Sequence, residues 1–265
     1  LGSRVIVHGK RDLPGLVATR PPHVLSAEER KKAVPWDKIF IDTGLPEKEV
    51  KRQVSIGDLV VMDQELVKLK NGRVAGKAFD DRACVAVLTL ALEQLAQIRH
   101  RWDVIAVATV QEEIGLKGAI TSAYGVAPDL AIALDVAFAG QPDLSGSDVN
   151  ELIKGPTLGL GPNFHPHLFK RLKKVAGDYE IPYQVEPVPG RHGTDAWAIQ
   201  VTHEGVPTAL ISVPVRYMHQ PVELLDTKDI ERAARWVTAF ITNLEIDYLD
   251  RLAWDDEPSE SNNEA

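Results

Sequence analysis

Hydrophobic positions in the first part of the chain occur in short runs. Runs such as RVIVHG (4–9) and GDLVVMD (57–63) are separated by glycine, proline and charged residues. Aliphatic, β-branched runs of this length, bounded by turn residues, are typical of strands. We therefore expect a small β-rich domain over residues 1–70.

The apolar runs become longer after Gly72. DRACVAVLTLALEQL (81–95) has the length and character of a buried helix. DVIAVATV (103–110) and DLAIALDV (129–136) are continuously apolar and of strand length, and LKGAITSAYG (116–125) between them has a helical pattern. Strands that are apolar on both faces and alternate with helices predict an α/β layered domain with a mainly parallel sheet.

The same alternation continues to the end of the folded region. Helices are expected at 165–179 and 194–205, and a strand at TALISVPV (208–215). A last helix follows Asp226, which is a plausible N-cap. We assign residues 71–253 to this second domain. Residues 254–265 are acidic and lack core residues, so we expect a disordered tail.

Composition narrows the class of protein. With 265 residues and 44% hydrophobic content, the chain can bury one large core and a small satellite domain. The net charge of -8 and the lack of a basic run argue against a nucleic-acid partner. No apolar stretch reaches the roughly 18 residues that span a bilayer. The single cysteine, Cys84, excludes an internal disulfide and favours a reducing, cytoplasmic location.

Reactive side chains stand at the predicted strand ends, where the sites of open α/β sheets gather. They are Glu112, Glu113, Asp135 and His219, with Asp80 and Asp81 just ahead of the helix at 81–95. An aspartate before a helix is commonly a cap, and loop glutamates or histidines are commonly solvated. Their convergence at one sheet edge adds a second interpretation, a Zn²⁺, Mn²⁺ or Co²⁺ hydrolase site, and the spacing alone does not decide between the two. In such a site one carboxylate bridges two ions about 3.5–4 Å apart and another takes a proton from water.

Five motifs occur in a fixed order along the chain: KAFDDR (77–82), ATVQEEIGLKGA (108–119), IALDV (132–136), HGTDA (192–196) and VPVRYMHQ (213–220). Together they resemble the M42 family of metallo-aminopeptidases, the tetrahedral and glutamyl aminopeptidase group. The resemblance implies a three-layer α/β/α zinc-peptidase-like domain with a mixed, mainly parallel sheet. It also implies that residues 1–70 are part of the family's inserted, PA-like β-domain.

The resemblance assigns roles to the reactive side chains. Asp80 becomes the carboxylate that bridges two divalent ions, Zn²⁺ or Co²⁺ or else Mn²⁺. Glu113 and His219 complete one metal site, and Asp135 serves the other. Glu112 becomes the general base. The implied activity is release of N-terminal residues from peptides.

Further implications concern substrate and assembly. His192, Thr194, Asp195 and Arg216 lie in or beside the matching motifs, and we expect them to contact or orient the substrate. Family members assemble from dimers into hollow dodecamers, so a homo-oligomer is expected.

The chain also departs from the family pattern. The family's other metal-ligating histidine lies in a His-x-Asp motif upstream of the β-domain, and this chain begins inside that domain. One site therefore lacks its histidine here. We expect a fragment of a longer enzyme; the alternative is a short protein with impaired or no activity. A third reading, an endoglucanase-like glycoside hydrolase, fits poorly, because adjacent Glu112 and Glu113 cannot flank a sugar at the required separation of about 5–9.5 Å.

Overall fold

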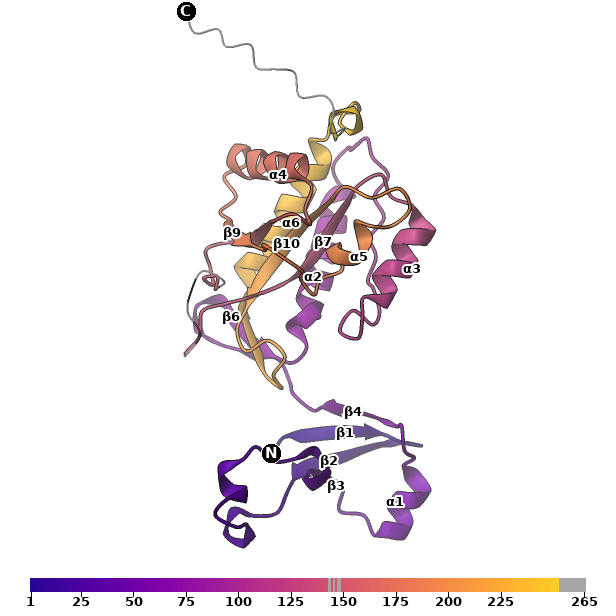
Figure 1. Ribbon diagram of the computed structural model, residues 1–265, viewed down its shortest axis with the longest axis vertical. Helices are drawn as coiled ribbons and strands as arrows, with labels where there is room; N and C mark the ends of the chain where they lie inside the picture. Colours follow the sequence, from indigo (N-terminus) through magenta and orange to yellow (C-terminus); the bar gives the residue numbers. More distant parts are fainter. Residues whose placement is uncertain (143, 145, 147–148, 253–265) are drawn as a thin grey trace, which may run out of the picture. The chain divides into compact units, whose positions relative to one another are not determined.

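The computed structural model describes residues 1–142, 144, 146 and 149–252 (Figure 1). The chain divides into two compact units, of which the first comprises Leu1–Val67 and the second begins at Lys68. Within the described residues, no helix combines the length and the apolar character needed to cross a bilayer. The acidic tail predicted at 254–265 lies outside the described residues.

The first unit contains a four-stranded antiparallel sheet with the order β3-β2-β1-β4. Its elements are β1 (Arg4–His8), β2 (Asp12–Ala18), β3 (Phe40–Asp42), the helix α1 (Glu47–Gln53) and β4 (Leu59–Met62). Val5 and Val7 of β1 are buried while their neighbours are more exposed, as the period of two along a strand requires. The predicted strands at 4–9 and 57–63 are confirmed.

The second unit is built on a four-stranded mixed sheet with the order β7-β10-β8-β9. The strands are β7 (Ala131–Phe138), β8 (Thr157–Leu160), β9 (Gln184–Pro187) and β10 (Thr208–Val215). β10 pairs parallel to β7 and antiparallel to β8, and β8 pairs parallel to β9. Every residue of β10 is buried, as expected for a central strand that is apolar on both faces.

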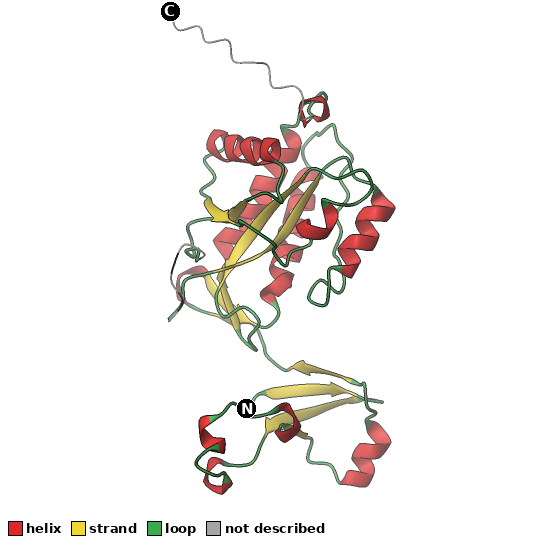
Figure 2. Ribbon diagram, viewed as in Figure 1, coloured by secondary structure: helices red, strands yellow, loops and turns green. Residues whose placement is uncertain are grey.

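Helices cover both faces of this sheet (Figure 2). They are α2 (Phe79–Leu95), α3 (Lys117–Val126), α4 (Pro166–Asp178), α5 (Ala196–Ile199) and α6 (Thr227–Thr242). Ile211 of β10 lies in one core with Val87 of α2 and Trp236 of α6. The adjacent Leu210 lies in a separate core with Ala196 of α5. Because successive strand residues point to opposite faces, the layers are helix, sheet and helix, and the predicted fold class is confirmed.

A second, three-stranded sheet has the order β11-β6-β5. It comprises β5 (Val67–Lys68), β6 (Arg73–Gly76) and β11 (Glu223–Asp226). β6 leads into α2, and β11 leads into α6. Asp226 caps α6 as predicted, because its side chain accepts a hydrogen bond from the backbone N–H of Lys228.

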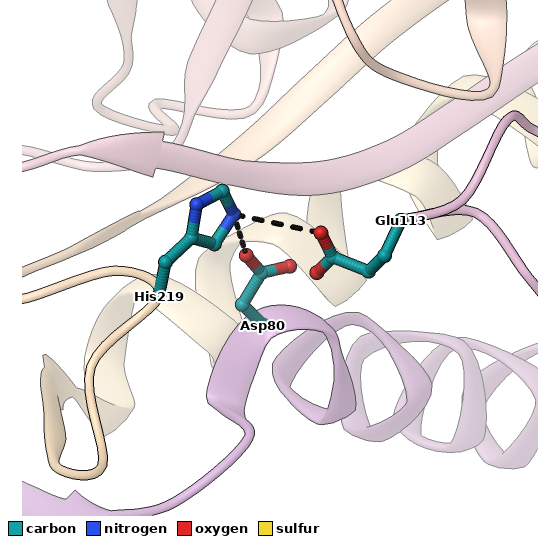
Figure 3. Close-up of side chains that lie close together, drawn as sticks. All are labelled: Asp80, Glu113 and His219. Atoms are coloured by element: carbon teal, nitrogen blue, oxygen red, sulfur yellow. Dashed lines mark ion pairs between the residues drawn. The ribbon is translucent and has the colours of Figure 1, made fainter. Parts of the chain in front are cut away.

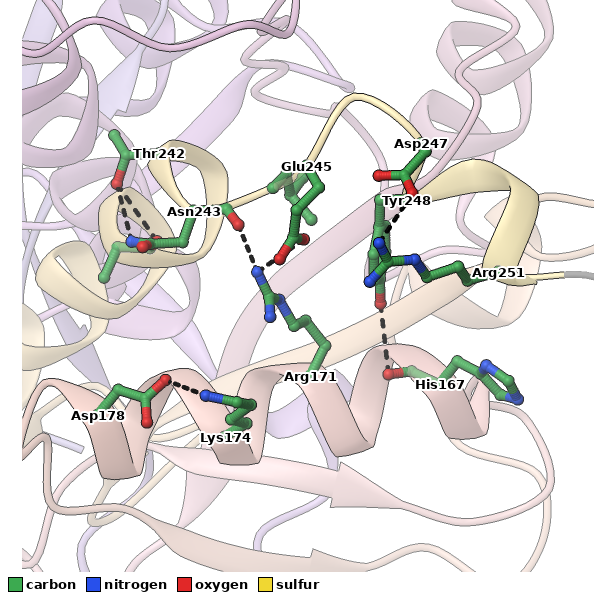
Figure 4. Close-up of polar contacts among 12 residues, drawn as sticks. His167, Arg171, Lys174, Asp178, Thr242, Asn243, Glu245, Asp247, Tyr248 and Arg251 are labelled. Atoms are coloured by element: carbon green, nitrogen blue, oxygen red, sulfur yellow. Dashed lines mark hydrogen bonds and ion pairs between the residues drawn. The ribbon is translucent and has the colours of Figure 1, made fainter. Parts of the chain in front are cut away.

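The segment after α6 is fastened to α4 by polar contacts (Figure 4). The Arg171 guanidinium donates to the backbone carbonyl of Asn243 and, over 2.9 Å, to the Glu245 carboxylate. The Tyr248 hydroxyl donates to the backbone carbonyl of His167 over 3.3 Å. These bonds hold the segment over the core that α4 and α6 share.

Two predicted elements differ from the structure. Residues 103–110 form no strand, because a strand requires a hydrogen-bonded partner and none of the described strands pairs with this segment. Its Ile105 and Val110 are exposed, at 61% and 69%. The helix expected at 194–205 is shorter, since α5 ends at Ile199 and His203 has a left-handed backbone conformation (φ 53°).

Candidate metal centre

Three side chains from distant parts of the sequence converge in the second unit (Figure 3). Asp80 lies in the first turn of α2, Glu113 in the loop before α3, and His219 in the loop after β10. His219 Nε2 lies 3.0 Å from Asp80 Oδ2 and 3.6 Å from Glu113 Oε2. One ligand atom from each residue falls within 4.8 Å of the other two. Two carboxylates and one imidazole can therefore contact a single ion.

The three side chains differ in exposure. The Asp80 side chain is 10% exposed, whereas those of Glu113 and His219 are 57% and 62% exposed. Asp80 thus forms the floor of the cluster, and the other two form a rim that solvent and solutes can reach.

The loop that carries the two glutamates is a tight turn. The backbone carbonyl of Glu112 accepts hydrogen bonds from the N–H groups of Gly115 and Leu116. Gly118 lies so close to the preceding segment that a Cβ there would meet the carbonyl oxygen of Val110 at 2.3 Å. The second glycine of the GLKG sequence is therefore required for this turn, which turns the chain back toward α3 immediately after Glu113.

His219 is presented by a second tight turn. Tyr217 and His219 both have left-handed backbone conformations, with φ of 61° and 63°. The backbone N–H of Tyr217 donates to Gln141 Oε1, and that of Gln220 donates to the Tyr217 carbonyl. Such conformations cost free energy in residues other than glycine, so the surrounding contacts must stabilise them.

Burial and mutual repulsion disfavour the ionised form of the acidic side chains in this region. Burial, followed by the Glu113 carboxylate, raises the pKa of Asp80 to about 6. Burial also raises the pKa of Glu112 to about 7, with Glu113 and Asp195 as the next contributors. Among the charges acting on Asp80, the His219 imidazole opposes the carboxylates. A bound cation would offset this excess of negative charge.

Asp135 lies apart from the compact group of three. It occupies β7, where its carboxylate accepts a hydrogen bond from the N–H of Val136 and its backbone carbonyl faces the Cys84 thiol at 3.0 Å. Burial, followed by Asp81, raises the pKa of Asp135 to about 9. The charges of Asp80 and Glu112 add to this rise in the pKa of Asp135, but Asp135 does not share the compact group of ligand atoms formed by the described residues.

Three of the four residues expected to meet substrate, His192, Thr194 and Asp195, lie in one segment just before α5. His192 Nδ1 accepts a hydrogen bond from the backbone N–H of Thr194 and lies 2.8 Å from the hydroxyl of that residue. Asp195 accepts a hydrogen bond from Thr109. The fourth, Arg216, lies at the end of β10 and pairs through its backbone with Leu224.

Glu223 was not predicted from the sequence. It is 2% exposed, and its carboxylate accepts hydrogen bonds from the backbone N–H groups of Asp80 and His219. The sequence feature that could have pointed to Glu223 is its position four residues after His219, at the start of a short apolar run. Surface strands have the same pattern, so this feature does not distinguish a site residue.

Comparisons with known proteins find similar sequences and structures over most of the chain. A sequence model of the family described as M42 glutamyl aminopeptidase matches residues 1–236. A lysyl aminopeptidase of Pyrococcus furiosus is 40% identical over 233 residues, which are 87% of this chain and 67% of that protein. The crystal structure of a TET aminopeptidase from a marine sediment archaeon, Thaumarchaeota archaeon, superposes with a TM-score of 0.89 at 36% identity, covering 96% of this chain and 73% of that one.

A second solved structure extends the comparison to assembly. The Pyrococcus horikoshii TET1 peptidase, which can assemble into a tetrahedron or a large octahedral shell, matches with a TM-score of 0.78 at 30% identity. The match covers 92% of this chain and 72% of that one. The chain thus spans about two thirds to three quarters of the length of these proteins.

Proposed function

Because this chain belongs to the M42 glutamyl aminopeptidase family, we propose that it is a metal-dependent aminopeptidase that hydrolyses the first peptide bond of peptides. The observation that carries the proposal is the convergence of Asp80, Glu113 and His219 on one point. We assign the individual ligands and the general base from the position of these three side chains and of the acids beside them.

The donor set fits a divalent ion. Carboxylate oxygens combined with an imidazole nitrogen suit Zn²⁺, Co²⁺ or Mn²⁺. Asp80, Glu113 and His219 would hold one ion, and Asp80 with Asp135 would hold the second. A bound ion supplies Lewis-acid activation of the scissile carbonyl and of water. The exposed rim formed by Glu113 and His219 leaves room for a peptide to approach.

Glu112 acts as the proton carrier in this proposal. It is adjacent to Glu113 and interacts electrostatically with Asp80 and His219, so its carboxylate lies near the three candidate ligands without belonging to their compact group. It takes a proton from the attacking water and donates it to the departing amine of the shortened peptide. The peptide bond breaks, the acyl carbon gains the water oxygen, and both products leave as ordinary peptides or amino acids.

The test combines metal removal with one substitution. The chain is assayed on lysyl, glutamyl and leucyl p-nitroanilides before and after EDTA treatment, and again with added Co²⁺ or Zn²⁺. Activity should disappear with EDTA and return with metal. Glu112→Gln should lower kcat by about 10²–10⁴-fold while the metal content stays unchanged. Glu93→Gln, at an exposed position of α2, is the matched control and should retain activity.

Each alternative has its own outcome. A Glu112→Gln variant that keeps most of the rate contradicts the assignment of the base. Metal binding without hydrolysis by the unmodified chain supports an impaired family member. Cleavage of cello-oligosaccharides that persists in EDTA supports a glycoside hydrolase instead.

Self-association is the second part of the proposal. The TET1 peptidase that this chain resembles can assemble into a tetrahedron or a large octahedral shell. In the first unit, large apolar side chains such as those of Trp36, Ile56 and Leu59 are highly exposed, at 89%, 108% and 72%. Exposed apolar surface of this kind is typical of protein interfaces. These observations support a homo-oligomer.

A further inference from the structure

Glu223 stands between the two segments that carry Asp80 and His219. It begins β11, which pairs antiparallel with β6, the strand that leads into α2 and Asp80. The next residue, Leu224, also exchanges backbone hydrogen bonds of 2.8 and 3.1 Å with Arg216, which precedes His219 by three positions. β11 therefore lies between β6, which leads to Asp80, and the segment at Arg216, which leads to His219.

The Glu223 carboxylate bonds to both ligand residues. Its Oε2 accepts a hydrogen bond from the backbone N–H of Asp80 over 3.0 Å. Its Oε1 accepts one from the backbone N–H of His219 over 3.1 Å. Glu223 is only 2% exposed, so its carboxylate is shielded from water. Hydrogen bonds to a charged group are strong, and water does not compete with them here.

Among the described residues, neither N–H group donates to a backbone carbonyl. The N–H of Asp80 stands at the start of α2, where the backbones of Asp80 and Asp81 are not helical and the cap residue Ala78 offers no side-chain bond. The helix therefore supplies no acceptor for this N–H. The N–H of His219 belongs to a residue with a left-handed backbone. A conformation of that kind persists where the surroundings determine it fully.

We propose that Glu223 is a positioning residue, which fixes the backbones of Asp80 and His219 relative to each other so that a divalent cation meets a preformed pair of ligands. The Glu223 carboxylate accepts hydrogen bonds from the two amides and is not one of the compact group of ligand residues found among the described residues, although its charge helps to raise the pKa of Asp80. The inference rests on the metal site of the proposed function, but it does not depend on catalysis. Groups that orient metal ligands in this way commonly change metal affinity by about 10–100-fold when they are replaced.

Two substitutions separate geometry from charge. Glu223→Gln keeps the length of the side chain but has one acceptor oxygen, so it can satisfy one amide and presents an NH₂ group to the other. Glu223→Asp keeps the charge but is shorter by one methylene group, so it cannot reach both amides. Both variants should bind Co²⁺ about 10–100-fold more weakly than the unmodified chain, as measured by competition with a chromophoric chelator. The visible absorption spectrum of bound Co²⁺ should also change, because the ligand geometry changes.

Asp229 provides a matched control. It is fully buried in α6 and its carboxylate likewise accepts hydrogen bonds from two backbone N–H groups, those of Ile153 and Gly155. It also pairs with Arg232, outside the candidate metal centre. Asp229→Asn should lower the melting temperature measured in EDTA, yet leave the Co²⁺ affinity and spectrum within about twofold of the unmodified chain.

The possible results are distinguishable. Unchanged Co²⁺ affinity in folded Glu223→Gln, or full affinity in Glu223→Asp, overturns the positioning role. An equal loss in Asp229→Asn also overturns it, because the effect is then general destabilisation. Failure of the unmodified chain to bind Co²⁺ overturns the metal site itself and, with it, the role of Glu223. If neither variant folds, amide hydrogen exchange of the unmodified chain decides: slow exchange at Asp80 and His219 supports the inference, and fast exchange at either overturns it.

Discussion

At the scale of single residues, one hydrogen bond links the segment before Glu112 to the start of α5. The Thr109 hydroxyl donates to Asp195 Oδ2 over 2.6 Å. Asp195 Oδ1 is buried and has no hydrogen-bond partner among the described residues. Burial raises the pKa of Asp195, and the bond from Thr109 opposes that rise. The carboxylate thus depends on Thr109 for its stabilisation.

Thr109→Val should therefore destabilise the fold by about 1–3 kcal/mol, because it leaves a buried acceptor without a partner. Urea unfolding measures the change. Thr121→Val is the control: Thr121 is exposed on α3 and its hydroxyl bonds to carbonyls of its own helix, so the expected effect is below about 0.5 kcal/mol. Equal effects of the two substitutions would contradict this account of Asp195.

His192 gives the fold a dependence on pH. Its ring packs against Phe164 and Trp197, with ring centroids 5.1 and 5.9 Å away. Burial lowers its pKa below the ordinary value of 6.5. Below that value the unfolded chain binds more protons at His192 than the folded chain does, so this contribution to stability is present above pH 6.5 and is lost as the pH falls.

The unmodified chain should consequently lose more free energy of unfolding between pH 7.5 and pH 5 than a His192→Phe variant does. Urea denaturation at the two pH values measures both losses. Identical losses, or a larger loss in the variant, would show that His192 is not held in its neutral form.

At the scale of secondary-structure elements, the sequence predicts side-chain character better than pairing. β10 and α6 were predictable because their apolar patterns match their periods and their burial. The segment 103–110 has an equally apolar pattern, yet it forms no strand. A strand needs a neighbouring strand as its hydrogen-bond partner, and the apolar pattern does not show whether one is present. The short strand β8, which contains Gly159, carries little signal of its own.

Some residues of the candidate site were predictable from the sequence, and others were not. The position of His219 follows from the rule that the loops after parallel strands meet at one edge of a sheet, because His219 follows β10. Glu113 was expected there after a strand at 103–110, which the structure does not contain, yet the turn before α3 brings Glu113 to the same point. Asp80 joins them because α2 begins at that edge. Glu223 was not predictable, since its contacts are with backbone N–H groups and no side-chain pattern reports those. Asp135, which the resemblance assigns to a second ion, lies in β7 outside the compact group formed by the described residues, and its role stays a prediction.

At the scale of the whole molecule, the proposed self-association gives a simple expectation. Light scattering coupled to size-exclusion chromatography should give a mass that is a multiple of the 29.1 kDa chain at micromolar concentration. The physical reason is the exposed apolar surface of the first unit, which favours burial against another copy. A mass of one chain at tens of micromolar would contradict the proposal.

The central claim is that Asp80, Glu113 and His219 bind a divalent cation, and anomalous diffraction tests it most directly. Crystals of the chain grown with Co²⁺ are measured above and below the cobalt absorption edge. We expect an anomalous peak about 2.0–2.2 Å from a carboxylate oxygen of Asp80 and of Glu113 and from His219 Nε2. No peak at this position, with the three side chains ordered, or a peak held only by other residues, would contradict the claim.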